Sequence, residues 1–141
     1  MMLRLYSMSG RLISRNVNKY KIKWDKPSRS KLQFNVKQFL KPHWKYQVCF
    51  EEFPVYGTRM SVDLVNFTKK IAIEVNGPQH KEFNKFFHGN SKAKYLSSIK
   101  RDWEKTEWLE KNGFELIEIE HDEVKGLSVD FIKNKFGISI I

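Results

Sequence analysis

Two short runs in the middle of the chain, residues 61–66 and 71–76, are rich in β-branched residues and alternate between apolar and polar positions. Two such runs joined by a few residues are typical of a β-hairpin. A turn centred on Thr68 and Lys69 pairs residues whose numbers sum to 137, so Asp63 faces Glu74 across the strands. One face of this hairpin is apolar and is expected to pack on a core. Its members are Val62, Leu64, Ile71, Ile73 and Val75.

The remaining pattern predicts further elements on both sides of the hairpin. In chain order we expect a helix over 29–40 ended by Lys41-Pro42, a strand over 46–53, a helix over 91–111, a strand over 114–120 and a helix over 128–136. The order helix, three strands, helix, strand, helix predicts an α+β fold with a mixed β-sheet flanked by helices.

The second face of the hairpin is polar and contains two opposed acids. Like charges directly opposite each other destabilise an antiparallel pair. A divalent cation held between hard oxygen ligands is the simplest compensation, and solvent or Lys and Arg partners are the ordinary alternative. Gly77-Pro78 then ends the second strand and brings His80 to the same end of the hairpin. The polar face consists of Ser61, Asp63, Glu74 and Asn76.

These residues, in this order, resemble the PD-(D/E)XK nuclease superfamily, and in particular the small branch related to very-short-patch-repair endonucleases. The similar motifs are Val62-Asp63-Leu64, Ile73-Glu74-Val75-Asn76-Gly77 with His80, Arg101-Asp102 in a helix, and Asn112-Gly113-Phe114 before a last strand. The resemblance extends over roughly residues 28–124. It implies a restriction-endonuclease-like fold and metal-dependent hydrolysis of DNA.

The resemblance also implies roles for individual residues. Asp63, Glu74 and the backbone carbonyl of Val75 would bind Mg²⁺ or Mn²⁺, which carboxylate and carbonyl ligands favour. The family usually has a lysine where this chain has Asn76, and an amide cannot take a proton, so another residue must activate water. His80 is the first candidate, because imidazole titrates near neutral pH, although a histidine after a turn is often only a surface residue. Weaker candidates are Lys31, Lys81 and Lys100.

The first helix departs from the family pattern at Gln33, where the family often has a metal-site glutamate. A glutamine carbonyl can accept a hydrogen bond near a cation but adds no charge, and an exposed helix glutamine is an equally good interpretation. Glu51 or Glu52, at the end of the first strand, is a reserve for the missing charge.

The net charge of +10 is concentrated in the first third of the chain. Residues 1–50 contain twelve Lys or Arg and one acid, giving +11, whereas residues 51–141 contain fourteen and fifteen, giving −1. Such a field attracts nucleic acid first and an acidic membrane surface second, and a solubilising tail is the alternative. We therefore expect a basic N-terminal arm over 1–25 and one nuclease domain over 26–141. The expected DNA-binding residues are Arg11, Arg15, Lys19, Lys21, Lys23, Arg29, Lys31, Lys81 and Lys100.

No apolar run is long enough to span a membrane, and the single Cys49 is expected to be buried and reduced. The expected compartment is the cytoplasm of a bacterium or a phage-infected cell, while the acid-free residues 1–14 leave organelle import open. The hypothesis is a metal-dependent DNA endonuclease of a phage or mobile element, with a homing, repair or junction-resolving role. A homodimer is one way to cut both strands. The alternative is a DNA-binding module on a decayed nuclease scaffold.

Overall fold

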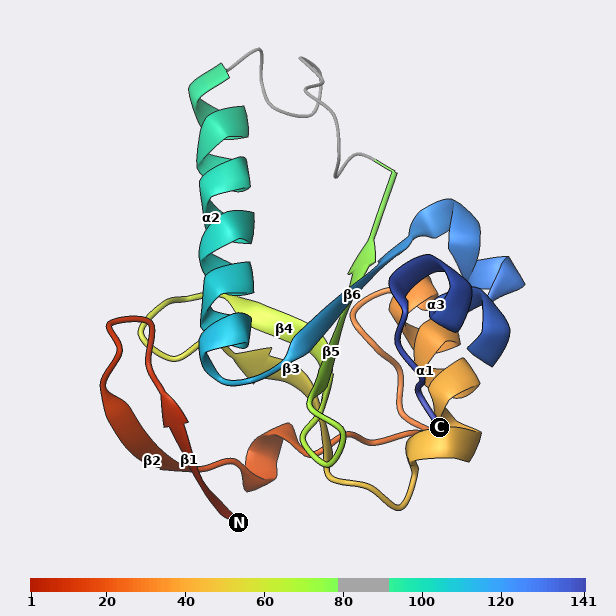
Figure 1. Ribbon diagram of the computed structural model, residues 1–141, viewed down its shortest axis with the longest axis horizontal. Helices are drawn as coiled ribbons and strands as arrows, with labels where there is room; N and C mark the ends of the chain where they lie inside the picture. The colour runs from red at the N-terminus through yellow and green to blue at the C-terminus, as the bar shows by residue number, and fades with distance from the viewer. Residues whose placement is uncertain (79–91) are drawn as a thin grey trace.

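A four-stranded mixed β-sheet lies between helices in the computed structural model, which describes residues 1–78 and 92–141 (Figure 1). Its strands are neighbours in chain order: β3 (Cys49–Pro54), β4 (Ser61–Asn66), β5 (Ile71–Asn76) and β6 (Glu115–Glu120). The first three are antiparallel, whereas β6 runs parallel to β5 after the crossover through helix α2. The predicted α+β class is therefore confirmed.

Each face of the sheet is covered by different elements. Helices α1 (Lys31–Trp44) and α3 (Val129–Phe136) pack on one face, and the short helix η2 (His121–Gly126) connects β6 to α3. Helix α2 (Lys92–Lys111) packs on the other face through Trp108 and Leu109, near its C-terminal end. No helix of the described residues is long and apolar enough to cross a membrane.

The hairpin β4–β5 has the predicted register, with Leu64 opposite Ile73 and Asn66 opposite Ile71. The predicted apolar face is wrong at Val62. Val62 packs with the α2-side cluster, whereas Leu64 packs with the α1-side cluster. The reason is an interruption of the alternation between the pairs Glu51–Leu64 and Phe53–Val62, where Glu52 and Asp63 are not paired and Glu52 has a left-handed φ of +50°.

Helix α1 begins as predicted but continues further than predicted. The Ser30 hydroxyl caps the helix by accepting a hydrogen bond from the Gln33 N–H at 3.1 Å. Pro42 does not end the helix, which runs on to Trp44. Trp44 is fully buried and its indole N–H donates to the Ile140 carbonyl at 2.8 Å, so tertiary packing holds a last turn that the proline weakens.

Residues 1–25 fold onto the sheet. Strands β1 (Met2–Tyr6) and β2 (Leu12–Asn16) form an antiparallel hairpin, followed by the short helix η1 (Asn18–Tyr20). Leu5 and Val17 are buried in the α2-side cluster, so this basic segment contributes to the core.

Candidate active site

Asp63 and Glu74 lie side by side where the β4–β5 ladder stops. The Asp63 N–H donates to Glu74 Oε2 at 2.9 Å, and the Val75 N–H donates to Asp63 Oδ2 at 2.8 Å. Each carboxylate thus accepts a hydrogen bond from a backbone N–H of the opposite strand. In a regular ladder, that N–H would donate to a backbone carbonyl. This exchange places two acidic side chains together without leaving those backbone donors unsatisfied.

Lys105 of α2 provides the nearest positive charge. Its ammonium forms an ion pair with Glu74 Oε1, and the side chains of Lys105 and Glu74 are only 16% and 13% exposed. An ion pair of this kind, largely removed from water, is held more firmly than a surface pair. The contact brings an amine from helix α2 to a carboxylate of the central strand.

A cleft of about 270 Å³ opens beside Asp63, between α2 and the start of β4. Its charged lining contains four cations and two acids, so that cations prevail around the carboxylate. They are Arg29, Arg59, Arg101 and Lys105, with Asp63 and Asp102. A cleft lined by one prevailing sign of charge concentrates ligands of the opposite sign, and phosphate groups fit this lining.

The carboxylate pair has the chemistry of a site for a hard divalent cation. Burial, followed by the neighbouring charge of Glu74, raises the pKa of Asp63 from 3.8 to about 7. A nearby cation would relieve both effects. Within residues 1–78 and 92–141, no group of three or more His, Cys, Asp or Glu side chains is arranged to bind a metal ion. Mg²⁺ typically uses only one or two carboxylates, together with water and substrate oxygens, so the pair fits this ion.

A second polar network connects α1 to β3, next to the cleft. The Gln33 amide nitrogen donates to Glu51 Oε2 and Glu52 Oε2, each at 2.9 Å. The fully buried Lys37 forms an ion pair with Glu51 at 3.0 Å. Glu52 also accepts from the hydroxyl of Ser61, a cleft residue, at 3.2 Å. Gln33 therefore orients acidic side chains through its nitrogen, and Glu52 lies near Asp63, where its charge contributes to the raised pKa of Asp63.

The other predicted catalytic and metal-site residues have different places. The Asn76 side chain is buried, donates a hydrogen bond to Glu120 of β6 at 3.2 Å and does not line the Asp63 cleft. Val75 contacts Asp63 through its N–H. His80 and Lys81 lie outside the described residues.

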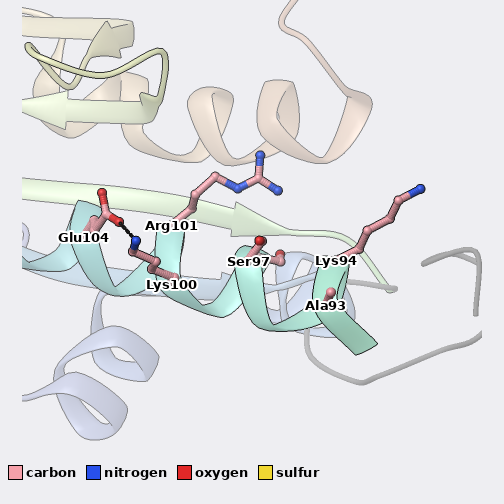
Figure 2. Close-up of a pocket in the computed structure, with 7 residues that line it drawn as sticks. Ala93, Lys94, Ser97, Lys100, Arg101 and Glu104 are labelled. Atoms are coloured by element: carbon pink, nitrogen blue, oxygen red, sulfur yellow. Dashed lines mark ion pairs between the residues drawn. The ribbon is translucent and has the colours of Figure 1, made fainter. Parts of the chain in front are cut away.

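The predicted DNA-binding residues divide into separate groups. Arg29 lines the Asp63 cleft. Lys100 does not: it pairs with Glu104 along α2, and both border an adjoining hollow of about 630 Å³, which shares Ser98 and Arg101 with the Asp63 cleft (Figure 2). Figure 2 shows the Arg101 side chain extending away from that pair. The remaining described members are exposed: Arg11, Arg15, Lys19, Lys21, Lys23 and Lys31.

Sequence reasoning missed Lys105 and Arg59, and it singled out Arg101 only as part of the Arg101-Asp102 motif, without a role in the site. A signal for two of them was available, because Ser98, Arg101 and Lys105 are spaced three and four residues apart and therefore share one helix face. All three line the cleft. The strand across the cleft from this helix face, β4, lies far away in the sequence, so the spacing alone did not indicate that the face lines a cleft beside Asp63.

Part of this chain is similar to a viral protein. The chain is 36% identical over 81 residues to "Uncharacterized protein 033L" of Invertebrate iridescent virus 3. The match covers 57% of this chain and 41% of the viral protein, so the chain spans less than half of that relative. No family model and no solved structure matches the chain.

Proposed function

We propose that this protein is a metal-dependent DNA endonuclease that hydrolyses phosphodiester bonds. The observation that carries the proposal is the Asp63–Glu74 pair, which needs additional positive charge and borders a cleft lined mainly by arginine and lysine. Carboxylates provide a site for the cation, and the basic lining provides sites for the phosphate. Few other reactions require both within one small cleft.

The residues of the site would divide the work. Asp63, Glu74 and the Val75 carbonyl would hold Mg²⁺ or Mn²⁺, which when bound polarises a phosphodiester and makes water more acidic. Arg29, Arg59 and Arg101 would bind phosphate oxygens from the cleft wall. Lys105 holds a proton on its ammonium beside Glu74 and would supply the charged amine that Asn76 cannot.

The arrangement of elements supports the same proposal. A helix, three antiparallel strands, a crossover helix and a parallel fourth strand are what the resemblance to the PD-(D/E)XK superfamily implies. Asp63 and Glu74 belong to the two central strands; Lys105 of α2 pairs with Glu74, and Gln33 of α1 donates to Glu52, whose charge acts on Asp63. The match to a viral protein agrees with an origin in a virus or mobile element.

Nicking of supercoiled plasmid and of a branched duplex in Mg²⁺, Mn²⁺ or EDTA tests the proposal. Wild-type protein should nick in either metal and not in EDTA. Asp63→Asn and Glu74→Gln keep the size of the side chains and should each lower the rate by about 10²-fold or more, the scale expected for a group that stabilises transition-state charge. Glu115→Gln, an exposed acid at the start of β6, is the matched control and should retain the wild-type rate.

Nicking that persists in both carboxylate variants would overturn the assignment of the site. The second candidate is a DNA-binding module without catalysis. It is favoured by Gln33, which donates to two carboxylates where the family often has an acid. This candidate replaces the first if neither substrate is cut with either metal while salt-sensitive DNA binding persists.

A further inference from the structure

A second cleft lies next to the Asp63 cleft. It measures about 230 Å³ and lies between β3 and the segment that joins η1 to α1. Arg29 lines both clefts. Glu52, which lines the second cleft, accepts a hydrogen bond at 3.2 Å from Ser61, which lines the first. The two clefts therefore meet at Arg29 and Glu52.

The second cleft is positively charged because its acids already have partners. Glu51 is paired with the buried Lys37, and Glu52 accepts from Arg29 and Gln33. The lysines on the opposite wall make no ion pair with any residue of 1–78 or 92–141, so their charge is not neutralised by the part of the chain that the structure describes. These lysines are Lys19, Lys21, Lys23 and Lys26.

The spacing of the lysines suits a linear polyanion. Lys21 forms an antiparallel bridge with Phe50, and Ile22 packs on the core while Lys21 and Lys23 both line the cleft. Residues two apart in such an alternating segment are roughly 6.6 Å apart. Lys21 and Lys23 are both exposed. Two cations at this spacing, in the same cleft as Arg29, can contact successive phosphates of one strand.

We infer that this second cleft binds the DNA backbone next to the phosphate held at Asp63, so that the substrate must extend past Arg29 towards η1. The inference rests on the proposed function, because it takes the Asp63 cleft as the place of the reacting phosphate. It defines the substrate as a polynucleotide with at least one further phosphodiester on that side. A mononucleotide or a terminal phosphate would leave the lysines without a ligand.

The test measures DNA binding in EDTA, where metal-dependent cleavage does not proceed. Fluorescence anisotropy with a labelled 20-base-pair duplex gives the dissociation constant over a range of salt concentrations. The double variant Lys21→Gln/Lys23→Gln removes both charges, keeps polar unbranched side chains and leaves the backbone hydrogen bonds of Lys21 and Ile22 in place. Its slope of log K against log salt should be shallower by about 1.8, which is about 0.9 for each phosphate that the variant no longer neutralises.

The matched control is Lys125→Gln/Lys133→Gln, two exposed lysines on η2 and α3 that line neither cleft. The control should retain the wild-type slope, and a dinucleotide too short to span both clefts should bind the cleft variant and wild type equally. Equal slopes for the cleft variant and the control would overturn the inference. If the slopes differ as expected but no DNA is cut, the nuclease proposal fails while the binding cleft stands. If DNA is cut and the slopes are equal, only this inference fails.

Discussion

Asp63 binds a proton more tightly in the folded protein than in the unfolded chain, because burial and Glu74 raise its pKa from 3.8 to about 7. The contribution of Asp63 to the free energy of unfolding is therefore most favourable below pH 4. That contribution is lost as the pH rises through 7, because the ionised carboxylate is disfavoured in the folded state. A shift of this size corresponds to about 4 kcal/mol between the two protonation states.

We expect Asp63→Asn to increase the free energy of unfolding at pH 8, by about 2–4 kcal/mol without divalent ions, and to have little effect at pH 4. Urea unfolding at both pH values measures the difference. Mg²⁺ should stabilise wild type at pH 8 and leave the variant unchanged, since a ligand stabilises only the state that binds it. Asp130→Asn, an exposed acid of α3, is the control, and identical pH dependence in all three proteins would contradict the expectation.

The amide nitrogen of Gln33 donates hydrogen bonds to two carboxylates, so replacing Gln33 with an acidic residue should destabilise the fold. We expect Gln33→Glu to lower the free energy of unfolding at pH 7 by about 3 kcal/mol, because both hydrogen bonds are lost and a third negative charge joins the cluster. Thermal unfolding measures the loss. Gln38→Glu is the control on the same helix, where the side chain donates a hydrogen bond to the Trp24 carbonyl and to no carboxylate of the described residues. Equal effects at both positions would show that charge on α1, and not this network, matters.

At the scale of elements, the parts set by local pattern could be predicted. The register of the hairpin followed from its turn, α2 ended at Asn112-Gly113, and Ser128 caps the last helix. The parts that could not be predicted depend on distant contacts. Trp44 carries α1 past Pro42 because it packs beneath the C-terminal tail, and Lys105 joins the site because the crossover brings α2 to β5.

The hydrogen bond from the Trp44 indole to the Ile140 carbonyl makes the stability of α1 depend on one side-chain nitrogen. We expect Trp44→Phe to lower the free energy of unfolding by about 2 kcal/mol, since the Ile140 carbonyl loses its donor and the smaller ring leaves space in the core. Denaturant unfolding measures the change. Trp103→Phe is the matched control, because this indole is 60% exposed. The expectation fails if both variants unfold alike.

At the scale of the whole molecule, the basic N-terminal segment, residues 1–25, both carries positive charge and contributes side chains to the core. Its hairpin is anchored by buried Leu5 and by a hydrogen bond at 2.7 Å from the Trp108 indole to the Tyr6 carbonyl. The charge asymmetry in the sequence indicated a surface for polyanions, but it gave no sign that the same residues cover the α2 side of the sheet. The reason is that the apolar residues of this segment are interleaved with Arg and Lys, and the elements on which Leu5 and Val17 pack lie far away in the sequence.

Leu5→Ala tests whether the N-terminal hairpin supports the rest of the protein. We expect a loss of about 2–4 kcal/mol in the free energy of unfolding, in a single transition for the whole chain, as for other buried leucines. Leu12→Ala removes the same atoms from a side chain that is 49% exposed and should cost much less. Far-ultraviolet circular dichroism and tryptophan fluorescence should report the same midpoint; an earlier transition confined to the hairpin would show that it melts independently.

The paired hydrogen bonds of Asp63 and Glu74 have a consequence for how occupancy of the site can be observed. An ion that draws on Asp63 Oδ2 or Glu74 Oε2 competes with the Val75 or Asp63 N–H for the same oxygen. Those two amide protons therefore sense the ion directly, through their resonance frequencies and their rates of exchange with deuterium. Nuclear magnetic resonance of two backbone positions would thus give a titration curve for the cation in the absence of any nucleic acid.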